Sequence, residues 1–313
     1  MATRVLVTGG AGFVGANLVR LLLGKGHAVT VFDNFDRGLE TYLEGLDVAV
    51  LRGDVRDAGA VSRALAGQEA VYHLAAYGSV IESIEDPDTN FQINVTGTLN
   101  VLKAAVARDV GKVVFSSTGG ALMGNTPPPV NERSVPRPIS PYGASKLACE
   151  GYLCAFAEAY GLDTLMFRFA NVYGPYSAHK KGVFNTYLAA IERGEPLVVY
   201  GDSVRDFIYA GDLAHGLVRG LEVETVPGDV FHLSTNRGVR IDDFARAMLA
   251  VRGRNDIELV RREGRRGEVV ENFAENAKAE AALGFRAATG LEEGLARTVD
   301  WFDRHRPLWT HAA

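Results

Sequence analysis

The chain contains 313 residues, of which 47% are hydrophobic and 23% are charged, and its formal net charge is −5. This composition is typical of a soluble globular protein, and the length suffices for one large domain or two modest ones. Acidic and basic residues are interspersed without a basic stripe, which argues against a nucleic-acid partner. No apolar run approaches the ~18 residues of a membrane span, and no signal-peptide pattern precedes the first strand, so we expect no membrane partner.

Cys149 and Cys154 are the two cysteines of the chain. Neither belongs to a metal-ligand pattern, and both fall in a segment with helical periodicity. We interpret them as small packing residues of a protein from a reducing compartment. The sequence therefore predicts a cytoplasmic protein without a metal site.

The N-terminal segment predicts a strand over residues 4–8, a glycine-rich turn and an apolar helix over residues 16–24. Gly9, Gly12 and Gly15 give the turn a G-x-x-G-x-x-G spacing, which differs from the G-x-G-x-x-G fingerprint. Glycines in this context permit a tight turn, a close approach of pyrophosphate to the backbone, and close packing of helix on strand. The segment therefore predicts a dinucleotide site at the N-terminus of the helix.

The second predicted strand, residues 28–32, ends in Asp33 and Asn34. A carboxylate at this place accepts hydrogen bonds from the adenosine ribose and repels the 2′-phosphate of NADP. The predicted cofactor is therefore NAD. Arg37 follows closely in the sequence, so NADP stays open as the alternative.

Strands and helices alternate through the first half of the chain, which is typical of parallel βαβ units. The further predicted strands cover residues 48–51, 70–74, 112–116 and 164–169, and the predicted helices cover residues 57–66, 87–108 and 142–160. Ligands bind at the carboxyl ends of the strands in such sheets. The residues at these ends are Gly9, Asp33, Asp54, Ala75 and Ser116. We therefore predict an α/β protein with a Rossmann-type doubly wound parallel sheet.

Tyr142 and Lys146 have the i, i+4 spacing that places two side chains on one face of a helix. An ammonium beside a phenol favours the phenolate, so we expect Lys146 to lower the pKa of Tyr142 from ~10 towards the operating pH. Thr118, at the end of a predicted strand, supplies a hydroxyl for the same substrate oxygen. These three residues are the candidate catalytic set.

The pattern becomes shorter and less regular after residue 170. Residues 119–139 are rich in proline, and we expect no regular element there. The later predictions are helices over residues 184–193, 211–221, 241–250, 276–283 and 291–304, a hairpin-like segment from Leu197 to Tyr209, and a strand from Phe231 to Leu233. We expect residues 1–170 and 206–235 to form the NAD-binding domain. Residues 171–205 and 236–313 are then a smaller mixed α/β substrate domain.

Several motifs together resemble those of the extended short-chain dehydrogenases/reductases, and within them the UDP-glucose 4-epimerase group. The motifs are the glycine turn Gly9–Gly15, His73–Ala76, Ser116–Ala121, Ser140–Lys146, Arg168–Pro175, Arg205–Phe207 and the run Arg265-x-Gly267-Glu268. They cover nearly the whole chain. The resemblance implies an NAD-dependent enzyme that acts on a nucleotide-sugar.

The resemblance also implies roles for individual residues. Positions that match the cofactor site are Gly9, Gly12, Phe13, Val14, Gly15, Asp33, Asn34, Asp54, Val55, Leu74, Ala75, Ala76, Asn94, Ser116, Tyr142, Lys146 and Phe169. Positions that match the nucleotide-sugar site are Ser79, Thr118, Tyr142, Asn171, Val183, Tyr200, Arg205, Arg265 and Glu268. Arginine forks suit a pyrophosphate, and Tyr200 suits stacking on uracil. A homodimer through the helix after Tyr142 and the helix over residues 87–108 is a further implication.

The implied reaction inverts C4 of a UDP-hexose. Tyr142 takes the proton of the sugar 4-hydroxyl, the C4 hydride passes to NAD⁺, and the 4-keto sugar receives it back on its other face. Thr118 holds the reacting oxygen, and Lys146 and the oxidised nicotinamide stabilise the phenolate. The sugar stays open among glucose, N-acetylglucosamine and glucuronate.

Three departures and two rival functions accompany this interpretation, and one departure is Glu268, which replaces the commoner aspartate. Met123 stands where the family usually has tyrosine, and the loops around residues 176–182 and 201–205 are short. His179, Lys180 and Lys181 form either a solvated loop or a contact for a substrate anion. The first rival is a nucleotide-sugar reductase or dehydrogenase, and the second is an NAD-binding sensor without activity. A 4,6-dehydratase is disfavoured, because such enzymes need an Asp-Glu pair where this chain has Gly119 and Gly120.

Overall fold

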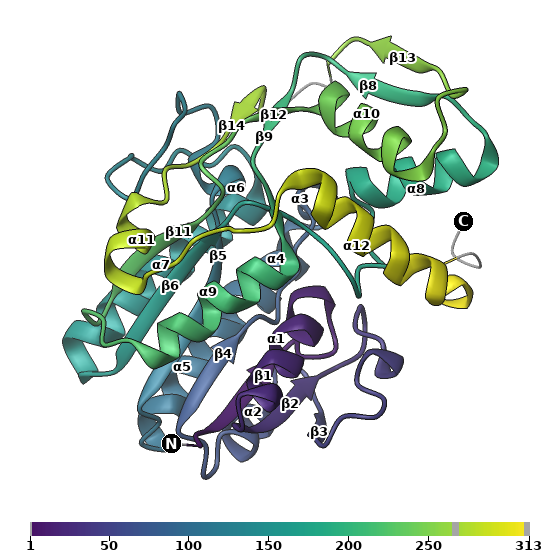
Figure 1. Cartoon of the computed structure of the whole chain (residues 1–313). Helices are drawn as coiled ribbons and strands as arrows, with labels where there is room; N and C mark the ends of the chain where they lie inside the picture. The colour runs from purple at the N-terminus through teal and green to yellow at the C-terminus, as the bar shows by residue number, and fades with distance from the viewer. Residues whose placement is uncertain (1, 265–268, 310–313) are drawn as a thin grey trace.

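A seven-stranded parallel sheet forms the centre of the computed structural model, which describes residues 2–264 and 269–309 (Figure 1). The strands lie in the order β11-β6-β5-β4-β1-β2-β3, and each pairs in parallel with its neighbours. They are β1 (Arg4–Thr8), β2 (Ala28–Asp33), β3 (Ala49–Arg52), β4 (Ala70–His73), β5 (Lys112–Thr118), β6 (Asp163–Phe169) and β11 (Asp229–Leu233). The predicted Rossmann-type parallel sheet is confirmed.

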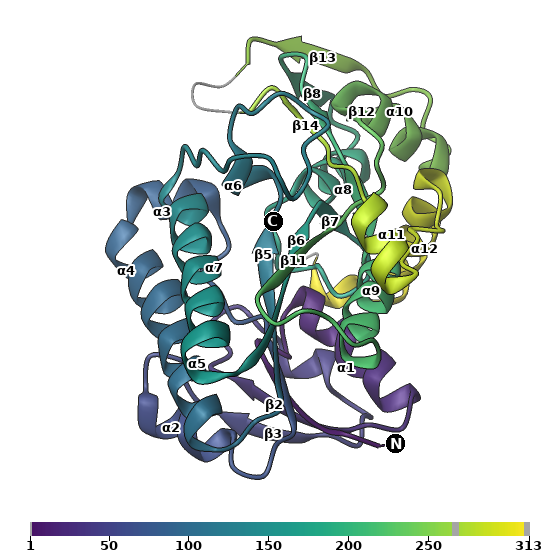
Figure 2. The ribbon, with the colours of Figure 1, turned by 90° about the vertical axis from the view of Figure 1, so that its left-hand side faces the viewer.

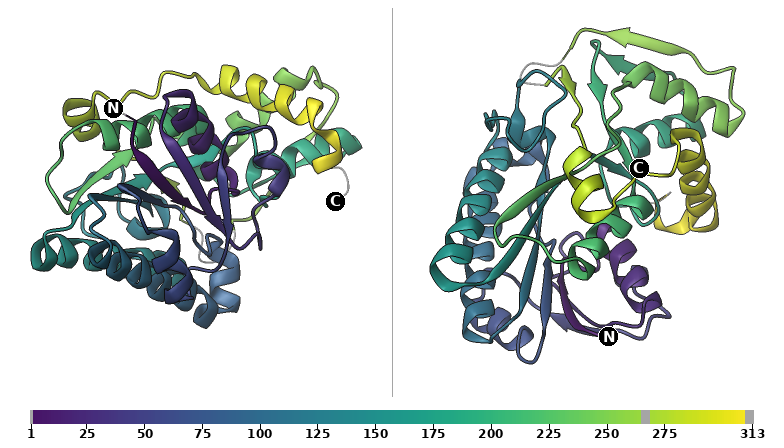
Figure 3. Two further views of the ribbon diagram at one scale, coloured as in Figure 1. Left: turned by 90° about the horizontal axis from the view of Figure 1, so that it is seen from below. Right: turned by 60° about the vertical axis from the view of Figure 1, so that its left-hand side comes forward.

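Helices cover both faces of this sheet, as Figures 2 and 3 show. One layer contains α2 (Ala58–Ala64), α3 (Val80–Glu85), α4 (Pro87–Phe91), α5 (Gly97–Ala107) and α7 (Pro141–Tyr160), and the other contains α1 (Phe13–Gly24), α9 (Ala210–Glu222) and α11 (Ala277–Leu283). The inner strands between the two helical layers are mostly buried, and all four residues of β4 are buried, whereas the edge strand β3 is exposed. This continuous burial explains the β-branched runs of the sequence, because both faces of a parallel sheet lie in the core.

A second core lies over the carboxyl ends of the strands, at the top of Figures 1 and 2. It is formed by α8 (Val183–Arg193), α10 (Ile241–Arg252), α12 (Leu291–Arg304), β8 (Leu197–Tyr200) and β13 (Leu259–Arg262). Phe207 and Phe244 stack within it at 4.2 Å between ring centroids. The exact domain boundaries remain a prediction.

The predicted hairpin from Leu197 to Tyr209 is wrong. Its three strands pair with partners that are distant in the sequence. In the structure β8 pairs in parallel with β13, β9 (Val204–Arg205) pairs with β12 (Val239–Arg240) and β14 (Glu271–Asn272), and β10 (Phe207–Tyr209) pairs in parallel with β7 (Asn171–Tyr173). Local periodicity carries no information about such partners, which is why the sequence suggested a turn between adjacent strands.

Two other expectations need correction. The helix expected over residues 87–108 is divided into α4, a π-helical turn (Gln92–Thr96) and α5, and α3 precedes it. Ser79 and Asp86 accept backbone N–H bonds as N-caps of α3 and α4, so each short helix has its own start signal. The proline-rich segment over residues 119–139 contains the short helix α6 (Gly120–Met123). Short 3₁₀ turns are η1 (Glu40–Tyr42) and η3 (Arg306–Leu308). Within residues 2–264 and 269–309, no helix is long and apolar enough to cross a membrane.

Candidate active site

The glycine turn between β1 and α1 is packed so closely that side chains are excluded from it. A Cβ atom on Gly15 would lie 2.2 Å from the carbonyl oxygen of Gly9, and Gly9 itself has a φ of +70°. Gly12 is the N-cap of α1, so the free N–H groups of the first helical turn face the space beyond the sheet edge. This arrangement fits the pyrophosphate of a dinucleotide, which needs close backbone approach and N–H donors.

Asp33 lies at the end of β2, as predicted, and only 7% of its surface is exposed. Its carboxylate accepts hydrogen bonds from the backbone N–H groups of Ala11, at 3.0 Å, and Phe35, at 2.9 Å. Burial raises the pKa of Asp33, and these N–H donors act in the opposite direction. Each oxygen keeps a free lone pair, so the carboxylate still suits ribose hydroxyl groups.

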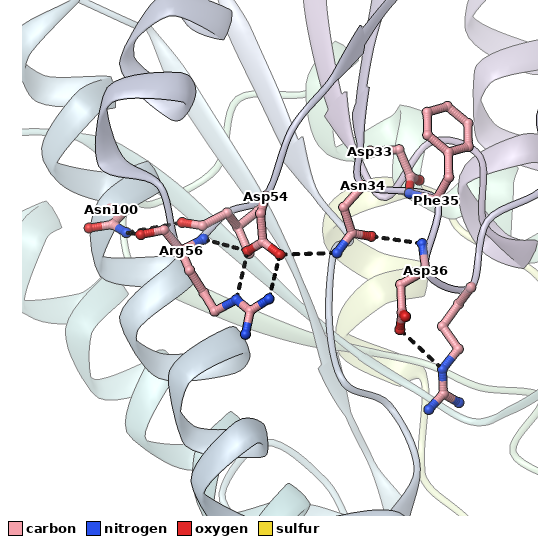
Figure 4. Close-up of polar contacts among 9 residues, drawn as sticks. Asp33, Asn34, Phe35, Asp36, Asp54, Arg56 and Asn100 are labelled. Carbon is pink, nitrogen blue, oxygen red and sulfur yellow. Dashed lines mark hydrogen bonds and ion pairs between the residues drawn. The ribbon is translucent and has the colours of Figure 1, made fainter.

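Asp54 and Asn34 form a polar chain beside Asp33 (Figure 4). The Asn34 amide donates to Oδ2 of Asp54 at 3.1 Å, and Arg56 chelates both carboxylate oxygens at 2.9 and 2.8 Å. The hydrogen bond from Arg56 is the main reason that the pKa of Asp54 falls to about 2. This end of the site therefore carries fixed carboxylates, as expected for an adenosine ribose.

A buried hydrogen-bond chain joins the ends of β1 and β4 to the helices behind them. The backbone N–H of Ala75 donates to Oγ1 of Thr8 at 3.2 Å, and this hydroxyl lies 2.7 Å from Nδ1 of His73. Nε2 of His73 lies 3.0 Å from Oγ1 of Thr98, which donates to the carbonyl of Asn94. Burial lowers the pKa of His73 to about 3, so the ring is neutral and acts as acceptor and donor. This role of Thr8 and Thr98 was not predicted from the sequence.

Asn94 connects this chain to the helix of the catalytic residues. Its side-chain oxygen accepts the N–H of Tyr77 at 2.7 Å, and its amide donates to Oγ of Ser145 at 2.9 Å. Ser145 in turn donates to the carbonyl of Tyr142 at 2.9 Å. The side chain of Asn94 thus fixes α7 relative to the cofactor edge.

The structure brings Thr118, Tyr142 and Lys146 together at the end of β5. Ser140 caps the N-terminus of α7, so Tyr142 lies in the first turn and its phenol shares a hydrogen bond with Thr118. The ammonium of Lys146 donates to the carbonyl of Ser116 at 2.7 Å. The three candidate catalytic residues therefore meet in one place.

The prediction that Lys146 lowers the pKa of Tyr142 is wrong for the protein without a bound cofactor. Burial raises the pKa of Tyr142 to about 12, and the hydrogen bond with Thr118 reduces this rise only in part. Lys146 is buried, donates to a backbone carbonyl, and has its own pKa lowered by burial to about 8. Its charge therefore does not bring the phenol towards neutral pH without a further positive charge nearby.

A buried ion pair lies behind the catalytic residues, and the sequence analysis did not anticipate it. Arg168 on β6 donates to both oxygens of Glu150 on α7, at 3.0 and 2.7 Å, and Ser117 donates to the same carboxylate at 2.6 Å. Their side chains are only 5% and 8% exposed. This pair fixes α7 on the sheet below Tyr142.

The predicted substrate residues outside the catalytic set lie on separate elements. Ser79 caps α3, Val183 opens α8, Tyr200 ends β8, Asn171 opens β7 and Arg205 ends β9. Asn171 donates to the carbonyl of Asp206 at 3.2 Å, while Arg205 donates to the carbonyls of Val204 and Val270 at 2.9 and 3.0 Å. Arg265 and Glu268 lie outside the described residues.

The loop with His179 and Lys180 contacts the cofactor side of the molecule. The His179 ring lies 5.8 Å from the Tyr42 ring, between centroids, and the Lys180 ammonium lies 5.4 Å from the centroid of Phe13. Burial lowers the pKa of Lys180, although the residue as a whole remains exposed. The ammonium therefore lies beside the aromatic ring at the start of α1. Among residues 2–264 and 269–309, no three His, Cys, Asp or Glu side chains are grouped as metal ligands.

Residues 5–233 match the model of the NAD dependent epimerase/dehydratase family. The chain belongs to this family. The UDP-glucose 4-epimerase of Mycolicibacterium smegmatis is 33% identical over 310 residues, which cover 96% of this chain and 98% of that protein. The solved structure of the Thermotoga maritima UDP-glucose 4-epimerase with UDP-glucose has a TM-score of 0.92 and 34% identity, and covers 97% of this chain and 99% of that chain.

A dehydratase of the same family is similarly close in fold. The dTDP-glucose 4,6-dehydratase of Streptomyces venezuelae, solved with NAD bound, has a TM-score of 0.92 and 31% identity, and covers 99% of this chain and all of that chain (100%). These matches confirm the resemblance to extended short-chain dehydrogenases/reductases of the UDP-glucose 4-epimerase type, and NAD as the cofactor. The chain is thus an NAD-dependent nucleotide-sugar enzyme of the epimerase/dehydratase family.

Proposed function

We propose that this enzyme is a UDP-sugar 4-epimerase, which inverts C4 of a UDP-hexose through a 4-keto sugar. The observation that carries the proposal is the backbone after Thr118. A Cβ atom on Gly119 would lie 3.2 Å from the carbonyl oxygen of Phe169, and one on Gly120 would lie 3.2 Å from Oδ1 of Asn272. The acid and base side chains that a 4,6-dehydratase needs here are absent from the sequence, and a Cβ atom at either glycine would be tightly packed.

The catalytic residues take the roles that their positions suit. Tyr142 exchanges a proton with the sugar 4-hydroxyl, and Thr118 donates a hydrogen bond to the same oxygen. Lys146, with a pKa of about 8, is mostly protonated near neutral pH and supplies positive charge beside the phenol. When bound along the glycine turn, NAD supplies the group that accepts and returns the C4 hydride. Its oxidised ring also adds the positive charge that the phenolate needs.

The nucleotide-sugar binds between the sheet edge and the second core in this proposal. Asn171 and Arg205 lie on β7 and β9, Tyr200 lies at the end of β8, and Val183 lies at the start of α8 packed against the second core. Arg205 is the guanidinium suited to the UDP pyrophosphate. We expect Arg265 and Glu268 to complete this site.

A homodimer in the cytoplasm is part of the proposal. Ile81, Ile84, Phe91 and Tyr152 are exposed apolar residues on α3, α4 and α7. These helices contact one another, so the exposed side chains share one face of the molecule. A second copy packed against this face would bury them.

Proton NMR of the anomeric region tests the function directly. Purified enzyme is mixed with UDP-glucose, UDP-N-acetylglucosamine or UDP-glucuronate, without added cofactor. A galacto-configured signal that grows to a constant ratio is the expected result and identifies the sugar. Turnover that requires stoichiometric NADH or NADPH would instead establish the reductase, and tight NAD binding without turnover of any nucleotide-sugar would favour the sensor.

A further inference from the structure

Arg37 lies in the loop that leaves β2 beyond Asp33, at the end of the site where the adenosine ribose is expected. A guanidinium in this region is the group that accommodates the 2′-phosphate of NADP. Asp33 favours NAD, whereas Arg37 would suit NADP, so the two residues indicate different cofactors. The side-chain contacts of Arg37 resolve this conflict.

Arg37 is engaged by a carboxylate from another part of the chain. Its Nη2 donates to Oε2 of Glu82 at 2.7 Å, and its Nε lies 3.6 Å from Oδ2 of Asp36. The guanidinium carbon also lies 5.3 Å from the centroid of the Tyr77 ring. The hydrogen bond between Arg37 and Glu82 raises the pKa of Arg37 and lowers the pKa of Glu82. The guanidinium, whose side chain is 51% exposed, therefore has a carboxylate and an aromatic face as its partners.

The pair connects two segments on opposite sides of the glycine turn. Arg37 follows β2 and Glu82 lies in α3, which follows β4, while β1 lies between β2 and β4 in the sheet. Ser79 fixes the first turn of α3 by accepting the N–H of Glu82 at 3.2 Å. Glu82 is therefore held on the far side of the β1 end, and it draws the Arg37 side chain in that direction.

The neighbouring arginines are paired as well, but within their own region. Arg52 pairs with Glu40, and Arg56 chelates Asp54. Glu40 and Asp54 come from the loops directly after β2 and β3. The partner of Arg37 is different, because Glu82 comes from a helix on the other side of β1.

We propose that Glu82 is a specificity-determining residue for the cofactor. By pairing with Arg37, Glu82 withholds the guanidinium from a 2′-phosphate, so that the carboxylate of Asp33 sets the charge at the ribose. Removal of the Glu82 charge frees Arg37 and admits NADP. This inference rests on the use of a dinucleotide by the family and is independent of the sugar.

The partition of the two dinucleotides measures this effect without any sugar substrate. Wild-type enzyme and the Glu82→Gln variant are dialysed to equilibrium against equal concentrations of NAD⁺ and NADP⁺, and the protein-bound nucleotides are released and quantified by chromatography. The bound NADP⁺/NAD⁺ ratio is expected to rise by about tenfold in Glu82→Gln, the effect of one new charge-assisted contact. Because no sugar is present, failure of the 4-epimerase proposal leaves this result unaffected.

Three further variants make the result specific. The double variant Arg37→Ala/Glu82→Gln is expected to lose the gain, since Arg37 supplies the new contact. Glu69→Gln removes a carboxylate of another exposed pair, with Arg4, and is the matched control for net charge. Glu82→Ala repeats the test with a second side chain, and circular dichroism checks folding throughout. An unchanged ratio in both Glu82 variants overturns the proposal, and so does a rise that persists without Arg37. Equal weakening of NAD⁺ and NADP⁺ binding also overturns the proposal, because Glu82 would then support the binding of either dinucleotide without discriminating between them.

Discussion

The cofactor edge of the sheet and the substrate side above it are built in different ways. The cofactor edge is formed by neighbouring parallel strands whose residues are mostly buried, and the glycine turn, Asp33 and Thr118 lie at the carboxyl ends of these strands. The substrate side is assembled from two- and three-residue strands, such as β9 and β7, whose partners come from distant parts of the chain. A local sequence pattern therefore describes the first region well and the second poorly.

Buried polar contacts show the same difference. Glu150 and Arg168 are almost fully buried behind Tyr142, whereas the pairs between Asp202 and Arg240 or Arg261 on the substrate side are largely exposed. Buried pairs fix geometry, while exposed pairs contribute little to stability and are screened by salt. We therefore expect the sheet behind Tyr142 to be held more firmly than the substrate side.

The largest expected effect is on turnover, through the phenol at the cofactor edge. Tyr142→Phe should lower kcat by about 10²–10⁴-fold, the usual contribution of a general acid–base group. NAD content should stay at the wild-type level, because the ring and its packing remain. Tyr160→Phe, at the exposed end of the same helix, is the matched control. Anomeric NMR rates and bound NAD are measured together, and wild-type turnover in Tyr142→Phe would refute the proposed mechanism.

The next effect is on stability, through the buried ion pair of the cofactor edge. Glu150→Ala should lower the free energy of unfolding by about 3–5 kcal/mol, because Arg168 is left as a buried charge without its partner. Glu195→Gln, in an exposed pair with Arg193, should leave the urea midpoint unchanged. If both variants unfold at the same urea concentration, the cofactor edge is not more rigid than the substrate side.

Two glycines of the turn have different expected roles, Gly15 in packing and Gly12 in binding. Gly15→Ala should cost about 1–3 kcal/mol of stability, because its Cβ would meet the Gly9 carbonyl oxygen at 2.2 Å. A Cβ on Gly12 would lie 3.2 Å from the same oxygen, so Gly12→Ala should be much milder for folding. It should still weaken NAD binding by about tenfold, since the methyl group would face the pyrophosphate. Urea unfolding and NAD titration distinguish the two, and equal stability losses would contradict the assignment.

The positions of the candidate residues were predicted correctly where each lies at the end of a single predicted strand or helix. The glycine turn, Asp33, Thr118 and Tyr142 all lie where strand and helix patterns predict. The His73 chain was missed, because it depends on the alignment of β1, β4 and α5, which no single segment encodes. The pKa of Tyr142 was wrong for a related reason, since burial of the phenol outweighs the charge of Lys146. Strand partners such as β8 and β13 were unpredictable from local periodicity.

The smallest expected effect is a dependence of stability on pH that both regions share. Burial lowers the pKa of His73, at the cofactor edge, to about 3 and that of His179, in the loop beside Tyr42, to about 4. Unfolded histidine titrates near ~6.5, so below this pH the unfolded chain binds protons that the folded chain excludes. Stability is therefore full above pH ~6.5 and falls as the pH decreases, by up to ~1.4 kcal/mol per pH unit for each histidine.

Replacing the histidine of the loop should make this decline shallower without disturbing the cofactor edge. Urea unfolding of His179→Gln is measured between pH 7 and about 5. The free energy of unfolding should decrease less steeply with falling pH than in the wild type, because one histidine no longer contributes to the decrease. His215→Gln, on the exposed face of α9, controls for the loss of an imidazole elsewhere. A slope that is unchanged in His179→Gln would mean that the loop opens and admits the proton before the protein unfolds. The substrate side would then be mobile where the cofactor edge, with His73 enclosed by Thr8 and Thr98, is not.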